Sequence, residues 1–213
     1  MDHEFRRAAI VVDIQRDFFE GGVLAACSSR DLIDPMNAFI TASVRQGIQI
    51  VLSRDWHPPN HRSFQSQGGR WPSHCVQNTS GAEFMDGLTI PPNAWIVDKG
   101  FDPDCPGYSD FECTNLESQL RDARIQDVAI CGIATEYCVA ANTRDALKLG
   151  FDSTLLLDLI RPLELKRGDA ARVLGELATL GAMMSESAAW LRGAHRSRQG
   201  MKSSIPRTER NDG

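Results

Sequence analysis

Short apolar segments alternate with segments of helical periodicity along most of the chain. The apolar segments span residues 8–13, 48–53, 95–98, 128–131, 153–158 and 182–184. Apolar residues recur at helical spacing in residues 31–46, 115–123, 135–150 and 164–180. Strands that alternate with helices are typical of a parallel sheet covered on both faces. We therefore predict an α/β fold with three α/β/α layers, in which a Rossmann-like, mainly parallel six-stranded sheet carries helices on both faces.

The composition is typical of a single globular domain. The chain has 213 residues, of which 42% are hydrophobic and 24% charged, and its net charge is −5. An acidic chain is not suited to nucleic-acid binding, and no apolar run approaches the roughly 20 residues of a membrane-spanning helix. The N-terminal residues also lack the pattern of a signal peptide. We expect a cytoplasmic protein with neither a nucleic-acid nor a membrane partner.

Two segments interrupt the alternation. Residues 58–93 are rich in Gly, Pro, Ser and Asn, and a connection of this length inside a compact domain is usually functional. We predict that it forms a lid or wall over a site and adds metal-binding residues. Residues 192–213 are polar and have no apolar face, which indicates a disordered tail. The expected organisation is therefore one domain over residues 1–191 followed by this tail.

The six cysteines are scattered along the sequence, at positions 27, 75, 105, 113, 131 and 138. Two of them fall in apparent core segments. This distribution favours reduced thiols in a cytosolic enzyme over a framework of disulfides.

Chemically distinct side chains follow four of the predicted strands. Asp13 closes the first strand, Asp55 and His57 follow the second, Lys99 follows the third and Cys138 follows the fourth. In open α/β sheets, ligands bind outside the carboxyl ends of the strands. Any one of these residues could be an ordinary polar strand end, but four consecutive strands supplying such groups are hard to assign to chance. We expect them to form one site.

Cys138 is the candidate nucleophile, because it lies in the first turn of a helix that begins just past a strand. Exposed N–H groups and the helix dipole favour a thiolate there. The alternative is a small buried hydrophobe, which describes Cys131 in mid-strand better. For Lys99 the alternative is a solvated loop cation, and for Asp13 a turn residue. Together the three would supply a nucleophile, a proton shuttle and a cation.

Asp55 and His57 form a candidate metal site. They are two residues apart and therefore project to one side of an extended backbone, and borderline divalent metals accept oxygen and nitrogen ligands together. The spacing is equally consistent with an Asp55 that only caps a turn. Residues 58–93 add His74, which a preceding Trp-Pro pair could stiffen, and His61, for which a solvated loop position is favoured over ligation.

Five segments carry a family pattern. They are VVDIQRDFFEGG at 11–22, RDWHP at 54–58, WPSHCV at 71–76, KG at 99–100 and GIATEYCV at 132–139. In this order they resemble the isochorismatase-like cysteine hydrolases, and within them the nicotinamidases, also called pyrazinamidases. The resemblance extends from about residue 8 to residue 184. Glu136 is a mild departure, because many relatives have Asp at that position.

The resemblance implies a catalytic role for Asp13, Lys99 and Cys138 as a triad. It also implies a cis peptide between Ile133 and Ala134, and an oxyanion hole formed by the backbone N–H groups of Ala134 and Cys138. These assignments rest on the matched motifs rather than on spacing.

The same resemblance implies one divalent ion, either zinc, iron or manganese, with Asp55, His57 and His74 as its ligands. His61 stands at a spacing different from that of the additional ligand in some relatives, and it stays a weaker candidate. Three aromatic residues would line a pocket for the substrate ring: Phe18, Trp71 and Tyr137.

The implied activity is hydrolysis of nicotinamide to nicotinate and ammonia in NAD salvage, through a thioester on Cys138, with pyrazinamide as a further substrate. The expected partner is thus a small-molecule amide, and assembly into a homo-oligomer is left open. Two alternatives remain. One is another amide or ureido hydrolase of the superfamily, and the other is a non-catalytic ligand-binding relative, which would not need a nucleophile.

Overall fold

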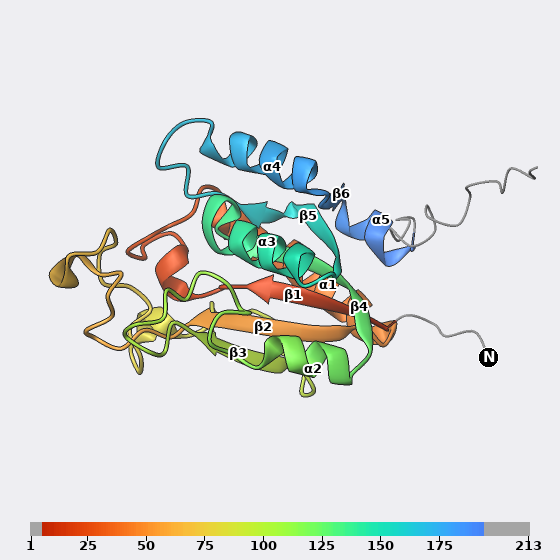
Figure 1. Cartoon of the computed structure of the whole chain (residues 1–213), viewed down its shortest axis with the longest axis horizontal. Helices are drawn as coiled ribbons and strands as arrows, with labels where there is room; N and C mark the ends of the chain where they lie inside the picture. Colours follow the sequence, from red (N-terminus) through yellow and green to blue (C-terminus); the bar gives the residue numbers. More distant parts are fainter. Residues whose placement is uncertain (1–5, 194–213) are drawn as a thin grey trace, which may run out of the picture.

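A six-stranded parallel sheet forms the centre of residues 6–193, the part of the chain that the computed structural model describes (Figure 1). The strand order is β3-β2-β1-β4-β5-β6, and every neighbouring pair is parallel. The strands are β1 (Arg6–Val12), β2 (Gln49–Asp55), β3 (Trp95–Lys99), β4 (Ile125–Ile133), β5 (Asp152–Arg161) and β6 (Met183–Ser185). The predicted fold class is confirmed.

Five α-helices connect or flank these strands. They are α1 (Ile33–Arg45), α2 (Leu116–Asp122), α3 (Ala140–Lys148), α4 (Asp169–Leu180) and α5 (Ser187–Leu191). In Figure 1, α2 and α3 lie in front of the sheet and α1 lies behind it. On the rear face, Phe39 of α1 packs against Trp190 of α5 with ring centroids 6.0 Å apart. On the front face, an ion pair of 3.4 Å between Arg144 and Glu176 links α3 to α4.

The topology places a crevice at the carboxyl end of β1. β1 lies between β2 and β4, and its residues Ala8–Val12 are all buried, as expected for a strand covered on both faces. The chain leaves β1 toward β2 and later crosses from β3 to β4 on the other side. A change of direction of this kind leaves room for a ligand beyond the strand ends.

Two helix starts differ from the predictions, and one short helix was not predicted. The helix expected from residue 164 begins at Asp169, because Glu164 (φ 53°) and Gly168 (φ 88°) adopt left-handed conformations that interrupt a helix. The helix expected from residue 135 begins as a π-helix, Thr135–Val139, before α3 follows. The short helix α5 was not predicted. Its residue Trp190 is buried, so the packed structure reaches almost to the expected tail, which from residue 194 onward lies outside the described residues.

Residues 58–93 contain no strand and run beyond the carboxyl ends of β1 and β2 (Figure 1). Short 3₁₀ helices occur here and near the N-terminus: η1 (Arg16–Phe18), η2 (Ser29–Leu32), η3 (Gln65–Gln67) and η4 (Ser80–Ala82). Single bridges join His57 to Val76 and Phe64 to Trp71, and the Phe64 side chain is fully buried. The segment is thus packed against the end of the sheet.

One expectation from the cysteines is wrong. Cys105 and Cys113 form a disulfide, whereas Cys27, Cys75, Cys131 and Cys138 are free thiols. The two bonded cysteines lie eight positions apart in the aperiodic connection after β3, where no sequence periodicity indicates that the chain turns back on itself.

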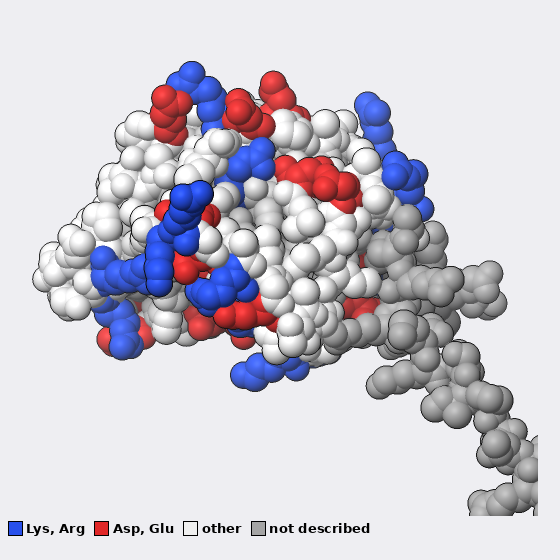
Figure 2. Space-filling view, turned by 90° about the horizontal axis from the view of Figure 1, so that it is seen from above, with Lys and Arg blue, Asp and Glu red and all other residues white. Residues whose placement is uncertain are grey.

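The surface carries charges of both signs. Seen from above, Lys and Arg side chains lie beside Asp and Glu side chains rather than in an area of one sign (Figure 2). On α4, for example, Arg172 pairs with Asp169 and Glu176. Within residues 6–193, no helix has the length and apolar character needed to cross a membrane.

Candidate active site

A buried lysine connects the ends of four strands. The register of β2 and β3 sets Asp55 opposite Lys99, and Lys99 Nζ contacts Asp55 Oδ1. The same ammonium lies 2.8 Å from Asp13 Oδ2, donates to the Gly107 carbonyl at 3.0 Å and lies 3.4 Å from Cys138 Sγ. Neither Lys99 nor Asp13 is exposed to solvent. The side chains predicted to meet at this edge of the sheet therefore do meet.

Cys138 is positioned by the turn between β4 and α3. The peptide between Ile133 and Ala134 is cis, as the resemblance implies. The Ala134 carbonyl accepts hydrogen bonds from the backbone N–H groups of Tyr137 (3.0 Å) and Val139 (3.1 Å), which closes the first helical turn around Cys138. In addition, the Asn142 side chain donates to the Cys138 carbonyl at 3.0 Å.

Asp13 has the electrostatic surroundings of a proton acceptor. Burial raises the pKa of Asp13 to about 7, although the Lys99 ammonium opposes the shift. The Ser53 hydroxyl donates to Asp13 Oδ1 at 3.2 Å and fixes the carboxylate. A carboxyl with a pKa near neutrality can both take up and return a proton.

The Cys138 thiol, in contrast, holds its proton at rest. Burial raises the pKa of Cys138 well above its ordinary value, and Lys99 offsets this only in part. The thiolate expected from the helix start alone is therefore not favoured in these surroundings. A base is needed to remove the thiol proton, and of the two carboxylates that share the Lys99 ammonium, Asp13 is the one with a raised pKa and a side-chain hydrogen bond to the thiol.

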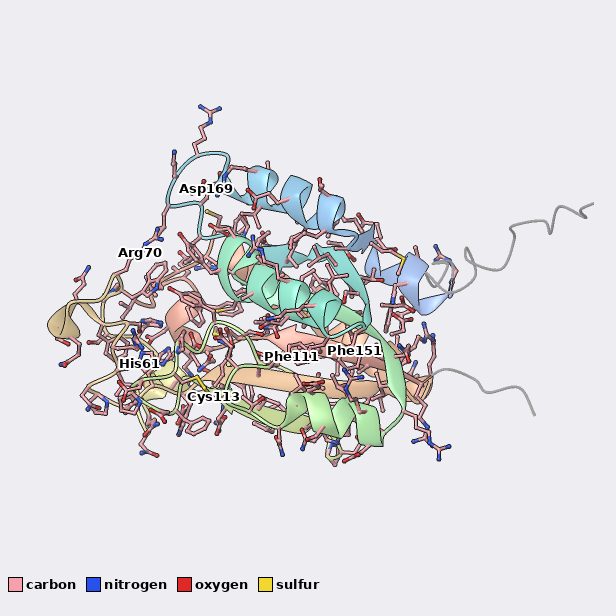
Figure 3. All side chains as sticks on the ribbon, in the orientation of Figure 1. His61, Arg70, Phe111, Cys113, Phe151 and Asp169 are labelled. Atoms are coloured by element: carbon pink, nitrogen blue, oxygen red, sulfur yellow. A yellow bond between two sulfur atoms is a disulfide. The ribbon has the colours of Figure 1, made fainter. Side chains whose placement is uncertain are left out.

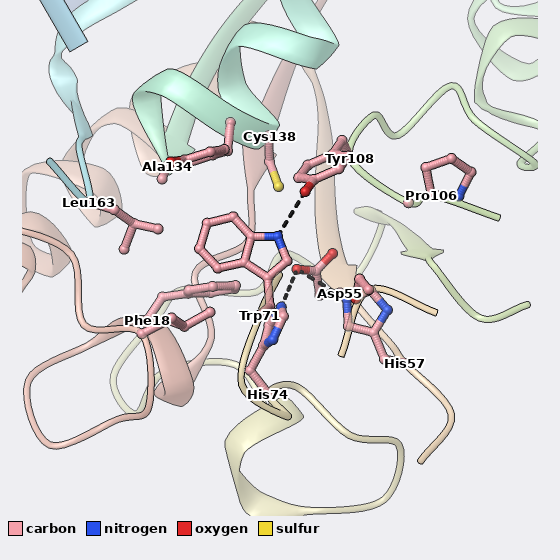
Figure 4. Close-up of a pocket in the computed structure, with 14 residues that line it drawn as sticks. Phe18, Asp55, His57, Trp71, His74, Pro106, Tyr108, Ala134, Cys138 and Leu163 are labelled. Atoms are coloured by element: carbon pink, nitrogen blue, oxygen red, sulfur yellow. Dashed lines mark hydrogen bonds and ion pairs between the residues drawn. The ribbon is translucent and has the colours of Figure 1, made fainter. Parts of the chain in front are cut away.

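Asp55, His57 and His74 form a compact set of metal-ligating atoms. One ligand atom from each lies within 4.8 Å of the others, with His57 Nε2 at 3.5 Å and His74 Nε2 at 3.7 Å from Asp55 Oδ2 (Figure 4). The Nδ1 atoms face backbone carbonyls, those of Gly100 at 3.1 Å and Pro72 at 2.8 Å.

An Nδ1–H bond to a carbonyl fixes the tautomer that leaves the Nε2 lone pair free for a metal. In this tautomer both Nε2 atoms carry a lone pair, and both face a carboxylate oxygen of Asp55, so none of the three atoms donates a proton to the others. A divalent cation placed among them would be bound by all three, so the set fits such an ion.

Asp55 remains ionised within this set. Burial alone would raise its pKa, but the Lys99 ammonium opposes burial and is the main cause that holds the pKa of Asp55 well below its usual range. Gln15, which the sequence interpretation missed, fixes the backbone of Asp55. It accepts from the Asp55 N–H at 2.8 Å and donates to the Asp55 carbonyl at 2.7 Å. A polar residue three positions beyond the end of the buried strand β1 was the available signal.

His61 is buried, so the expectation of a solvated side chain is wrong. Its Nδ1 faces the Ser63 hydroxyl at 2.7 Å and its Nε2 faces the Cys105 carbonyl at 2.8 Å. Its ring packs against that of His57 with centroids 4.2 Å apart. Both ring nitrogens thus have hydrogen-bond partners other than Asp55, and the His61 ring holds the His57 ring in place by packing against it.

A pocket of about 410 Å³, its open mouth included, lies between the metal-ligating set and Cys138 (Figure 4). The three predicted aromatic residues line it, as do Ala134 and Cys138. Trp71 and Tyr137 meet edge to face, with centroids 4.9 Å apart. The size and the aromatic walls suit one small planar ring.

Several other residues line the pocket although they were not predicted to do so: Leu24, Ser63, Pro106, Gly107, Tyr108 and Leu163. Tyr108 accepts a hydrogen bond of 2.8 Å from Trp71 Nε1. Leu163 is held by Glu136, whose carboxylate accepts from the N–H groups of Leu163 and Glu164 at 3.3 and 2.6 Å. These residues come from aperiodic loops, where sequence patterns carry little information.

Known proteins share both the sequence and the fold. Residues 7–187 match the family model of the isochorismatase domain. Over 205 residues the chain is 34% identical to the nicotinamidase of Escherichia coli, covering 86% of this chain and 96% of that protein.

The pyrazinamidase of Pyrococcus horikoshii in complex with zinc superposes with a TM-score of 0.81 at 45% identity, covering 85% of this chain and 99% of that one. The yeast nicotinamidase bound to the inhibitor nicotinaldehyde gives 0.79 at 30% identity, covering 84% and 99%.

The matched span contains every residue of the site described above. The relatives are covered almost from end to end, so the likeness extends over the whole catalytic unit. The resemblance noted in the five sequence segments is thereby confirmed. This chain belongs to the isochorismatase family, on its nicotinamidase and pyrazinamidase branch, and is an amidohydrolase.

Proposed function

We propose that this protein hydrolyses nicotinamide to nicotinate and ammonia, and that it also hydrolyses pyrazinamide. The observation that carries the proposal is a pocket of the size of one small ring, bordered by the Cys138 thiol and by the candidate metal ligands Asp55, His57 and His74. The relatives named above act on or bind compounds of this kind. A pyridine or pyrazine carboxamide has a ring nitrogen at one end and an amide at the other, which matches the two ends of the pocket.

The proposed nucleophile is Cys138, and Asp13 is its base. Asp13, Asp55 and Cys138 each place one atom within 4.8 Å of the others, so Asp13 is within reach of the thiol proton. The thiolate attacks the amide carbon, while Lys99 stabilises the carboxylate and the thiolate as charges move between them. Asp13 then returns the proton to the departing ammonia and leaves a thioester on Cys138.

The proposed oxyanion hole consists of the backbone N–H groups of Ala134 and Cys138, both of which line the pocket. Loss of one such donor typically costs about 3 kcal/mol of transition-state stabilisation. In the second half of the reaction, Asp13 removes a proton from water, which attacks the thioester and releases nicotinate. The aromatic rings of Phe18, Trp71 and Tyr137 hold the substrate ring in place and exclude bulk water.

We propose Asp55, His57 and His74 as the ligands of one divalent ion, for which zinc, iron and manganese are the candidates. When bound, the ion would supply a Lewis acid that accepts the ring nitrogen of the substrate. The two imidazoles are already oriented by carbonyl groups, and Asp55 is already ionised, so the chain needs little rearrangement to hold it.

The organisation of the chain stays a proposal as well. We infer one hydrolase domain over residues 1–191 with residues 58–93 as its metal-binding wall, and a cytoplasmic location. The scattered free cysteines support that location, while the Cys105–Cys113 disulfide is an exception to the pattern. Fractionation of the producing cell tests the location, and light scattering of the purified protein tests whether it forms a homo-oligomer.

Ammonia release tests the proposed function. The substrates are nicotinamide, pyrazinamide and a set of ureido compounds, each measured with and without a chelator. We expect nicotinamide to be the preferred substrate and activity to disappear on chelation and return with metal. Preference for a ureido compound would replace nicotinamidase by another hydrolase of the family, and no turnover of any amide would indicate a ligand-binding protein.

Two cysteine variants test the nucleophile in the same assay. Cys138→Ala should lower turnover by about four orders of magnitude, because the remaining groups cannot form the thioester. Cys131→Ala is the matched control, since Cys131 is also buried but its thiol faces the Ile10 carbonyl and Met36 in the hydrophobic core rather than the pocket. Comparable activity in Cys138→Ala and wild type would refute the assignment.

A further inference from the structure

The disulfide between Cys105 and Cys113 encloses part of the active-site wall. Between the two cysteines lie Pro106, Gly107 and Tyr108, all of which line the pocket. Figure 3 shows the disulfide at the same end of the sheet as His61. Residues 106–112 are therefore a small closed loop, and one side of this loop faces the substrate.

Gly107 connects this loop to the catalytic lysine. Its carbonyl accepts a hydrogen bond of 3.0 Å from Lys99 Nζ. Its backbone packs against Gly100 so closely that an added Cβ would come within 2.5 Å of Gly100 Cα. Gly100 in turn offers its carbonyl to His57 Nδ1 at 3.1 Å. A shift of Gly107 would thus disturb both Lys99 and a metal-ligating histidine.

Tyr108 connects the loop to the aromatic wall, because its hydroxyl accepts the 2.8 Å hydrogen bond from Trp71 Nε1. Cys105 itself forms a third connection, since its carbonyl faces His61 Nε2 at 2.8 Å and the His61 ring packs on His57. The half of the loop next to Cys105 therefore makes the contacts that matter for the site.

The other half of the loop is anchored to the body of the protein. Phe111 stacks on Phe151, at the entrance to β5, with centroids 6.0 Å apart. The Asp110 N–H donates to the side chain of Asn142 in α3 at 3.1 Å, while Glu112 stiffens the loop internally by accepting from the N–H groups of Tyr108 and Ser109 at 3.1 and 3.4 Å. The disulfide transfers this anchorage to the Cys105 end, which otherwise belongs to an aperiodic connection without helix or strand.

We propose that the Cys105–Cys113 disulfide is a positioning element of the active site, and that its reduction lowers catalytic efficiency because Gly107 and Tyr108 lose their fixed places. This inference rests on the proposed function for its kinetic readout. Cys105 is buried, whereas Cys113 is exposed, so a reductant reaches the bond from the Cys113 side. Activity therefore depends on the redox state of a bond that takes no part in the chemistry.

The reductant for the test is a water-soluble trialkylphosphine. It breaks the S–S bond and is oxidised to the phosphine oxide, while water supplies the oxygen and the two protons that yield two thiols. Cys138 is already a free thiol and is not changed by this reagent. Thiol alkylation followed by mass spectrometry verifies that the oxidised protein has two fewer reactive thiols after unfolding than the reduced one.

The kinetic experiment compares wild type, oxidised and reduced, with the double variant Cys105→Ser/Cys113→Ser and with Cys27→Ser as a control at an exposed cysteine. We expect reduction and the double substitution each to lower kcat/KM for nicotinamide by about tenfold, since small misplacements of groups that position substrate and Lys99 have effects of this size. The double variant should not respond to the phosphine, and Cys27→Ser should behave as wild type.

Hydrogen exchange provides a readout that does not depend on turnover. Reduction should speed amide exchange in residues 100–112 and leave β1 and β4 unchanged. Equal kcat/KM and equal exchange in the oxidised and reduced proteins would overturn the inference, because the contacts of Phe111 with Phe151 and of Asp110 with Asn142 would then suffice to hold the loop. An oxidised protein that releases no ammonia from nicotinamide would instead refute the proposed function, and the exchange comparison would still decide whether the disulfide fixes the loop.

Discussion

At the scale of single residues, the site is dominated by one cation among several carboxylates. Burial would lower the pKa of Lys99, but Asp13 and Asp55 outweigh burial and raise it well above its ordinary value. The ammonium therefore stays charged without access to water. Removing it would leave two buried carboxylates without their partner, a change that typically costs several kcal/mol.

A third buried carboxylate, Asp110, adds to this negative charge. It lies in the loop closed by the disulfide, and its backbone N–H donates to the Asn142 side chain at 3.1 Å. Burial raises the pKa of Asp110 to about 6 and Asp55 adds to the shift, although Lys99, Asn142 and Ser53 oppose it. Asp110 thus takes up a proton in the folded protein at a pH where an unfolded chain would release it.

Because the pKa of Asp110 is higher in the folded state than in the unfolded chain, Asp110 stabilises the fold less as the pH rises. Between about pH 4 and pH 6 the folded state binds the extra proton, so the contribution of Asp110 to the free energy of unfolding is lost as the pH rises through this window. Asp110→Asn should consequently gain stability relative to wild type between pH 4 and pH 8, by an amount on the order of 3 kcal/mol.

Denaturant unfolding of both proteins at the two pH values, with chelator present throughout, measures this gain. Asp31→Asn is the control, because Asp31 is exposed and its loss should leave the pH dependence unchanged. A constant difference between Asp110→Asn and wild type at both pH values would contradict the assignment.

At the scale of elements, the spacing of apolar residues in the sequence predicted the strands and the main helices. The inner strands were found because most of their residues are buried, as in the run Ala8–Val12, and the partly buried edge strands β3 and β6 because of their short apolar runs. The proximity of Asp13, Lys99 and Cys138 could be predicted because parallel strands deliver their carboxyl ends to one edge. The start of α4 could not be predicted, because the left-handed conformations of Glu164 and Gly168 depend on how the loop packs rather than on apolar spacing.

The contacts made by the connection after β3 were also not predicted from apolar spacing. Tyr108 and Gly107 take part in the pocket through single hydrogen bonds to Trp71 and Lys99, and no repeat marks such contacts in a sequence. The disulfide also escaped prediction, because two cysteines among six scattered ones do not reveal that their chains meet. His61 was misassigned for a related reason, since a polar loop is expected to face water unless tertiary contacts bury it.

Two glycines on different elements should respond in opposite ways to alanine. Gly107→Ala should destabilise the protein and lower turnover, because Gly107 has φ +71° and a Cβ would come within 2.5 Å of the Gly100 backbone.

Gly175→Ala should raise stability by up to about 1 kcal/mol, since this exposed position in α4 has nothing within 4 Å of a Cβ. Thermal unfolding and ammonia release measure both effects, and a stable, fully active Gly107→Ala would show that the close contact with Gly100 is not required.

At the scale of the whole molecule, the candidate site residues lie at the ends of four of the six strands. The strands β3, β2, β1 and β4 lead to Lys99, Asp55, Asp13 and Cys138 respectively, whereas β5 and β6 complete the sheet. The metal-ligating set combines two parts of the chain, because Asp55 and His57 belong to the end of β2 and His74 to residues 58–93. A bound ion would therefore tie the long connection to the sheet.

Metal binding should accordingly stabilise the folded protein. At a free metal concentration about a hundredfold above Kd, binding adds about 2.7 kcal/mol, which corresponds to a rise in Tm of roughly 5–10 °C for a chain of this size. Calorimetry of the chelated protein with added zinc or manganese measures the rise. His74→Ala should lose most of it, and an equal rise in that variant would exclude His74 as a ligand.

The complete burial of Lys99 has a consequence for chemical labelling. Reagents that acylate amines need an accessible, neutral nitrogen, and Lys99 is neither accessible nor neutral while the site is closed. Lys148 and Lys166 are exposed on the surface and provide internal references on the same chain. The rate at which Lys99 is acylated, relative to the rates of those two lysines, therefore reports how often the site opens to solvent.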